Sequence, residues 1–235
     1  MKIETPSMER SDDTQEELKY GTTGDEFKPL DQIILPDVRQ QSWGHLKPDG
    51  TIRKVQLADL HHRMSGVTVN SSAPQDVRTA FDTARNLFLY SWFVYRFVTV
   101  AELQAYAALE FALGRRIEID KLSEVRGLAR RFDLAIKRGW LRAEGIRRCQ
   151  RSAVARKDYE ETHGQLLREY LAAEGAVLNE PNKKTEPEYA FEYLHNLKGS
   201  IPKLRNYVAH GEPMLHNGAA VTLEICCDLI NQLFP

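Results

Sequence analysis

The chain has 235 residues, of which 42% are hydrophobic and 28% charged, a composition typical of a globular protein with an apolar core. Its longest apolar run, around "WFVY" at Trp92 to Tyr95, is interrupted by Arg96, whereas a membrane-spanning helix needs about 20 apolar residues. The first residues contain no apolar signal core. We therefore expect a cytoplasmic protein that has no membrane partner.

The N-terminal part of the chain is predicted to consist of a tail and a small extension. Residues 1–27 are polar and acidic and lack apolar periodicity, which predicts a disordered acidic tail. In the extension, residues 28–71, a turn at Pro48-Asp49-Gly50 separates two short alternating runs. This pattern predicts a β-hairpin, which we expect to pack on the body because an isolated hairpin is unstable in water.

Residues 72–235 are predicted to form an all-α domain of four to six helices, because apolar residues recur at helical spacing. Capping boxes that begin at Ser72 and at Thr99 predict the starts of the first two helices. Gly114 is placed to end the second helix, and a third is expected between Asp120 and Gly139.

The second half of this domain has a less regular pattern. Arg142–Lys157 is strongly basic and only weakly periodic, whereas Tyr159–Ala173 is predicted to be helical. After a loop rich in Gly, Pro and Asn, a capping box at Thr185 predicts the next helix. Pro202 is expected to open a separate short helix, and Asn217 the last one.

The cysteines and the acidic residues give no sign of a metal or a cofactor. Cys149, Cys226 and Cys227 are odd in number and have no metal-ligand spacing, so we expect free thiols, with Cys226 and Cys227 as small packing residues on a helix. No His/Cys/Asp/Glu cluster has the spacing of a metal site, and no phosphate-binding loop or dinucleotide fingerprint occurs.

Charge is distributed unevenly along the chain. Between Arg115 and Lys157 there are 14 Lys and Arg residues against 5 Asp and Glu, a local excess of +9, and the remainder carries −10. Such segregation can direct a positive field at an anionic partner. The alternative is an ordinary solvated helical face.

The stretch "KLRNYVAHGEP", Lys203 to Pro213, places three chemically useful side chains close together: Arg205, Asn206 and His210. On a helix, Asn206 and His210 lie one turn apart and share a face, with Arg205 about 100° to one side. Because His210 directly precedes a Gly that should end the helix, its imidazole can project beyond the last turn.

These residue types suit the cleavage of RNA without a metal ion. A histidine, with an ordinary pKa near ~6.5, can take the proton of the 2′-hydroxyl that attacks phosphorus. An arginine can bind two phosphate oxygens and stabilise the extra charge of the transition state. A neighbouring amide such as that of Asn206 can orient the histidine or hold the phosphate.

The segment "RNYVAH" resembles the Arg-x(4–6)-His motif of the HEPN family, in which a polar residue commonly follows the arginine. In addition, "AYAALEFALGRR" (Ala105 to Arg116) is similar to the Ala-Leu-Glu helix of HEPN bundles. The segment "LAIKRGWL" (Leu134 to Leu141) looks like the helix end that often follows. The resemblance covers Ala73 to Phe234 and leaves the N-terminal extension unexplained.

The resemblance implies a helical bundle that dimerises and brings two Arg-His pairs together. It implies a metal-independent endoribonuclease, a toxin or defence effector, in which Arg205, Asn206 and His210 are catalytic. Its partners would be RNA, a second copy of the chain, and an antitoxin or regulatory protein. The side chains that we expect to bind RNA are Arg130, Arg131, Arg138, Arg147 and Arg148.

Other interpretations of the same residues remain open. His210 can be a helix C-terminal histidine that the helix dipole favours, and Arg205 can be half of a surface ion pair. The domain can also be a non-catalytic HEPN-like module that binds RNA or dimerises, or the motif can be a coincidence. His195 and His216 flank the motif, although His195 fits an amphipathic helix face equally well.

Overall fold

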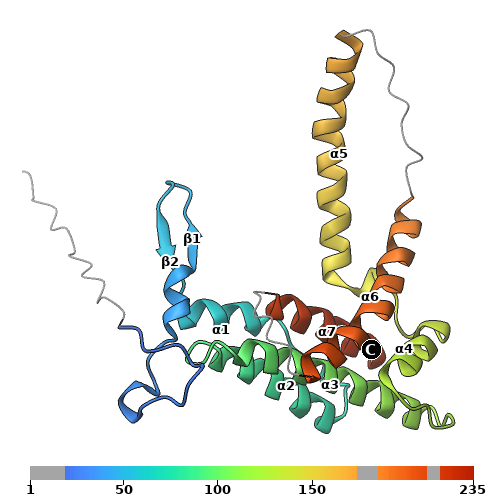
Figure 1. Ribbon diagram of the computed structural model, residues 1–235. Helices are drawn as coiled ribbons and strands as arrows, with labels where there is room; N and C mark the ends of the chain where they lie inside the picture. Colours follow the sequence, from blue (N-terminus) through green and yellow to red (C-terminus); the bar gives the residue numbers. More distant parts are fainter. Residues whose placement is uncertain (1–18, 174–184, 211–217) are drawn as a thin grey trace, which may run out of the picture.

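The computed structural model describes residues 19–173, 185–210 and 218–235. Seven α-helices are described: α1 (Leu57–Ser65), α2 (Gln75–Tyr90), α3 (Phe97–Ile119), α4 (Leu128–Lys137), α5 (Arg147–Ala173), α6 (Glu186–Ala209) and α7 (Ala219–Leu233). One antiparallel sheet joins β1 (Gly44–Leu46) and β2 (Ile52–Lys54), and short 3₁₀ helices occur at Leu30–Gln32, Val38–Ser42 and Ala143–Gly145. The predicted mainly helical fold with a small hairpin is confirmed (Figure 1).

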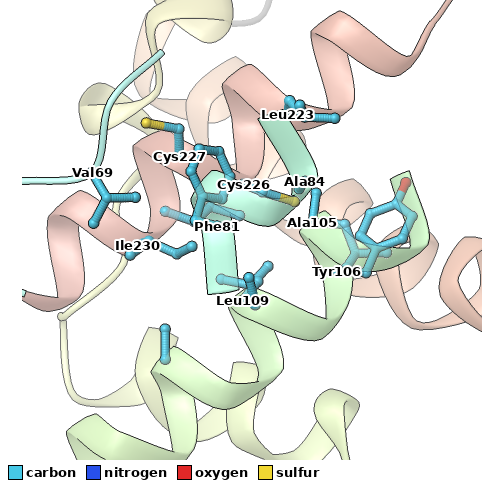
Figure 2. Packing of buried hydrophobic residues seen from close by; sticks show 14 of the residues in the cluster. Val69, Phe81, Ala84, Ala105, Tyr106, Leu109, Leu223, Cys226, Cys227 and Ile230 are labelled. Atoms are coloured by element: carbon cyan, nitrogen blue, oxygen red, sulfur yellow. The ribbon is translucent and has the colours of Figure 1, made fainter. Parts of the chain in front are cut away.

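The core lies between α2, α3 and α7, and Figure 2 shows its side chains interdigitating. Helix α3 is central, because it also contacts α4 and α6. Its small buried residues, among them Ala105 and Ala108, allow neighbouring helices to approach it closely. Phe81 of α2 fills the space beside them and is fully buried.

The predicted hairpin is present and its base is tied to α1, because Arg53 of β2 donates to Asp59 at 2.8 and 2.9 Å, but its tip does not pack on the helices. Gly50 adopts φ +82°, which the tight turn between the two strands requires. The strands project from the body in Figure 1, and the side chains of Leu46 and Ile52 are 76% and 70% exposed. The expectation that the hairpin packs on the body is therefore wrong for its tip.

A buried carboxylate attaches the N-terminal extension to the body. Asp37 accepts hydrogen bonds from the backbone N–H groups of Gly24 (2.8 Å), Tyr95 (3.1 Å) and Arg39 (3.0 Å). The Arg39 guanidinium donates two more, from Nε at 2.9 Å and Nη2 at 2.8 Å. These bonds join three segments that lie far apart in the sequence.

Part of the predicted acidic tail contacts the body. Asp25 forms ion pairs with Arg39 at 3.1 Å and with Arg96 at 2.5 Å. Residues 19–27 therefore have contacts that the absence of apolar periodicity did not predict. The rest of that predicted tail, residues 1–18, lies outside the described residues.

Both predicted capping boxes at the start of the domain are wrong, although the helices themselves are present. Helix α2 begins after Pro74 without a side-chain cap, and the Ser72 hydroxyl donates instead to the Phe234 carbonyl at 2.6 Å. Helix α3 begins two residues before Thr99, whose hydroxyl donates back to the Arg96 carbonyl at 2.9 Å.

Gly114 does not end its helix as predicted. Helix α3 runs through it to Ile119, and a Cβ atom at Gly114 would lie 2.9 Å from Nη1 of Arg131. This glycine therefore makes room for a side chain that crosses the helix. The next helix is also shorter than expected, since α4 starts only after Gly127 (φ +86°), although Gly139 follows its end as predicted.

In the second half, helices are more continuous than the sequence suggested. Arg142–Lys157 and Tyr159–Ala173 do not form two units, because one helix, α5, extends from the body in Figure 1. Helix α6 continues through Pro202, although proline has no backbone N–H and the helix therefore lacks one hydrogen bond there. Buried Leu194 and Ile201 hold it against the core before that position. The predicted helix start at Asn217 lies outside the described residues.

Candidate active site

The sequence motif lies at the end of α6, where this helix crosses α3. The Arg205 side chain is 39% exposed, and its Nη2 donates to the Glu110 carboxylate at 3.3 Å. Its Nη1 donates to the side-chain oxygen of Asn206 at 3.1 Å. The Arg205 Nε is buried and has no hydrogen-bond acceptor within the described residues.

Arg205 and Asn206 line a cavity of about 320 Å³ between α3, α4 and α6. Two more arginines line it, Arg126 in the segment before α4 and Arg130 in the first turn of that helix. Among the described lining residues Glu110 supplies the single carboxylate and is already engaged by Arg205, while Arg126 also pairs with the exposed Glu124 at 3.0 Å. The cavity therefore has a net positive lining.

The N-terminus of α4 adds to this positive potential. Its first turn lines the cavity, and no described side chain caps the helix start at Gly127. Unsatisfied N–H groups at a helix N-terminus carry partial positive charge and favour anions. Guanidinium groups and a helix N-terminus around one cavity suit a phosphate group.

Arg131 supports this cavity from behind and does not face it. Its Nε donates to the Val125 carbonyl at 2.7 Å, and its Nη1 donates to the Glu110 carbonyl at 3.0 Å. These bonds tie the segment before α4 to α3. Two of its donor nitrogens are thus engaged by backbone carbonyls, and its expected role in RNA binding stays a prediction.

The structure leaves His210 apart from the cavity. It caps the C-terminus of α6 (φ −85°, ψ 3°), where its backbone N–H donates to the carbonyls of Asn206 at 3.0 Å and Tyr207 at 3.2 Å. Its exposed side chain forms no hydrogen bond with described residues. One helical turn, roughly 6 Å along the axis, separates it from Asn206. His216 lies outside the described residues.

The basic segment is partly neutralised in space by acidic residues from other parts of the chain. Arg147 donates to the buried Asp228 at 2.7 Å, and Arg151 pairs with Glu224 at 2.7 Å. Arg147 also donates to the Gly66 carbonyl at 3.0 Å, so its guanidinium is engaged within the fold, and its expected role in RNA binding stays a prediction. The arginines of the predicted set that stay exposed are Arg130, Arg138 and Arg148.

Two residues of the cavity were missed by sequence reasoning. Glu110 is the acidic residue of the "AALEF" segment, which the sequence analysis singled out without giving Glu110 a role. In the structure it accepts a hydrogen bond from Arg205. Arg126 stands beside Gly127 and was given no role either. It became a candidate only because the chain before α4 turns toward α6.

Further expectations concern thiols, metal ions and membranes. Cys149, Cys226 and Cys227 are free, and the last two are buried in α7 as predicted. Within the described residues, no three His, Cys, Asp or Glu side chains group closely enough to hold a metal ion. No described helix is both long and apolar enough to cross a bilayer.

Comparison with known proteins adds nothing to these observations. No family model, no curated protein and no solved structure matches this chain.

Proposed function

We propose that this protein is a metal-independent endoribonuclease of the HEPN type, with Arg205, Asn206 and His210 as its active site. One observation carries the proposal: Arg205 and Asn206 share a cationic cavity with Arg126, Arg130 and the N-terminus of α4. A cavity of this charge suits the scissile phosphate of RNA. Its position beside the motif is what favours RNA over a free anion.

In the proposed reaction His210 removes the proton of the 2′-hydroxyl, and the resulting oxyanion attacks the adjacent phosphorus. The bond from phosphorus to the 5′-oxygen breaks, which leaves a 2′,3′-cyclic phosphate and a 5′-hydroxyl. Arg205 binds the non-bridging oxygens, whose negative charge grows in the transition state. Glu110 positions Arg205, because it holds one arm of the guanidinium.

The leaving 5′-oxygen needs a proton from a general acid. A single His210 that has acted as base cannot supply it in the same step. In a homodimer, a second copy of His210 would act as the acid, and this requirement supports the expected dimer. An enzyme that cuts cellular RNA also needs restraint, which agrees with a toxin or defence effector held by an antitoxin or regulatory protein.

The test is cleavage of a mixed RNA pool in EDTA by wild type and by His210→Ala. We expect wild type to leave 2′,3′-cyclic phosphate ends, and His210→Ala to be slower by at least about 100-fold, a typical contribution of general acid–base catalysis. His195→Ala is the matched control, because His195 is exposed on the same helix and contacts the Phe191 ring in a tilted arrangement, with ring centroids 4.2 Å apart. Equal cleavage by wild type and His210→Ala would refute the assigned role.

A non-catalytic RNA-binding module is the second candidate. It is favoured by the pairing of Arg205 with Glu110 and by the distance of His210 from the cavity. This candidate predicts that folded wild type binds RNA without cutting it, and that Arg205→Gln weakens binding while His210→Ala does not.

A further inference from the structure

A separate cavity of about 670 Å³ lies between the N-terminal extension and the helical body. Its lining is mainly apolar and comes from five parts of the fold: the base of the hairpin, α1, the junction of α2 with α3, the start of α5, and α7. The apolar side chains that define it are Trp43, Val55, Leu60, Phe88, Val98 and Val221. Cavities of a few hundred Å³ with apolar walls typically bind small molecules.

The charged side chains around this cavity favour an anionic ligand. Arg63 and Arg148 line it, and neither forms a hydrogen bond or an ion pair with a described residue. Asp59 is the only carboxylate among the described lining residues, and both its oxygens are already engaged by Arg53, at 2.8 and 2.9 Å. A ligand would therefore meet two available guanidinium groups and a neutralised acid.

The walls also favour a flat ring. Trp43 is 37% exposed although it lies at the base of the hairpin, and Tyr95 lines the cavity from the turn before α3. Indole and phenol rings pack well against planar aromatic groups. The backbone around Trp43 is fixed, because its N–H donates to the Gln40 carbonyl at 3.1 Å and its own carbonyl accepts from Val55 at 3.1 Å. The wall is thus in place before any ligand binds.

We propose that this cavity binds a small aromatic anion, a planar apolar ring that carries one phosphate, sulfonate or carboxylate group. The ring lies between the apolar walls, and Arg63 and Arg148 bind the anionic group. This site is distinct from the cavity at Arg205, with which it shares no described lining residue. The proposal does not depend on RNA cleavage.

The test uses a matched pair of fluorescent probes on the full chain. 1-Anilinonaphthalene-8-sulfonate carries one negative charge, and N-phenyl-1-naphthylamine is its neutral counterpart. We expect R63Q/R148Q to weaken binding of the sulfonate by at least about tenfold, because charge-assisted hydrogen bonds are lost. Binding of the neutral probe should change by less than about twofold.

Two further variants distinguish binding in this cavity from binding elsewhere on the protein. Arg138→Gln removes an exposed arginine outside the cavity and should leave both probes unaffected. Val221→Trp fills the cavity from α7 and should abolish binding of both probes, while circular dichroism shows an unchanged fold. If the sulfonate binds R63Q/R148Q as tightly as wild type, or if Val221→Trp still binds both probes, the proposal is wrong and the probes bind exposed apolar residues elsewhere.

Discussion

The core of α2, α3 and α7 and the corner where α4 meets α6 differ in what holds their helices together. In the core, Phe81, Leu109 and Leu223 are fully buried and belong to one cluster of apolar side chains (Figure 2). Burial of such side chains contributes about 1.5–3 kcal/mol each. The core therefore supplies most of the stability.

In the corner, buried apolar side chains such as Phe132 and Ile201 are joined by polar contacts between the helices. Lys198 of α6 pairs with Asp133 of α4, and Arg205 pairs with Glu110 of α3. These side chains are 22–39% exposed, and such pairs contribute only about 0–1 kcal/mol each. The comparison shows that the candidate site lies where residues can change at little cost in stability, which is where functional polar groups are tolerated.

The largest expected effect comes from breaking the core. Phe81→Ala should lower the free energy of unfolding by about 3–5 kcal/mol, because the truncation leaves a cavity that its close-packed neighbours cannot fill. Phe191→Ala is the control, since that ring is 64% exposed on α6, and it should cost less than about 1 kcal/mol. Urea denaturation measures both, and equal losses would contradict the assignment of the core to α2, α3 and α7.

A buried polar contact gives the next largest effect and adds a dependence on pH. Although burial opposes its charge, Asp37 has a pKa of about 2, below the usual 3.8, because Arg39 and three backbone N–H groups donate to it. Since the folded state holds the ionised form, this contact adds about 2 kcal/mol above pH 4, and that stability is lost as the pH falls from about 4 to about 2.

Asp37→Asn should therefore remove about 2 kcal/mol at pH 7 and flatten the acid limb of the stability curve. Asp228→Asn is the matched control. Burial raises the pKa of Asp228 above its usual value, although Arg147 donates to it, so its ionised form is disfavoured in the folded state. We expect a smaller loss for Asp228→Asn at pH 7 than for Asp37→Asn. A larger loss would show that hydrogen-bond number does not decide which buried aspartate stabilises the fold.

The sequence was sufficient to predict the helices of the core, but not the polar contacts around it. Apolar periodicity predicted α2, because a helix that packs on one face leaves a repeat of 3.6 residues. Helix α3 was expected from a capping box that the structure does not contain, and α7 as the last helix after Asn217. The boundaries were less predictable. Gly114 was expected to stop a helix, yet a side chain from α4 crosses there, and no local pattern records such a contact.

The candidate site was predictable only in part for the same reason. Arg205 and Asn206 are adjacent in sequence, so their common location follows from the helix alone. Arg126 joins them through the turn at Gly127, a long-range arrangement that its neighbours in sequence do not specify. The sequence of the basic segment also does not reveal which of its arginines are paired. Acidic partners such as Asp228 lie far along the chain and approach only in the fold.

A smaller effect on stability is expected in the corner itself. Glu110→Gln should change the free energy of unfolding by less than about 1 kcal/mol, because the ion pair with Arg205 is partly exposed. Under the proposed function, loss of this negative charge should strengthen RNA binding, while a less well-positioned Arg205 should slow cleavage. Fluorescence anisotropy and single-turnover cleavage measure these separately. If Glu110→Gln changes neither, Glu110 does not position Arg205.

Thiol labelling tests the same contrast between core and periphery without changing stability. Burial raises the pKa of Cys227 to about 12 and that of Cys226 further, whereas Cys149 is only partly buried at the start of α5. Because the thiolate is the reactive form, fewer than about one in a thousand Cys227 thiols is ionised at pH 8. Iodoacetamide should therefore label Cys149 alone in the native protein and all three cysteines in urea, with mass spectrometry as the readout. Native labelling of Cys226 or Cys227 would mean that α7 opens readily. The core would then not be more rigid than the corner between α4 and α6.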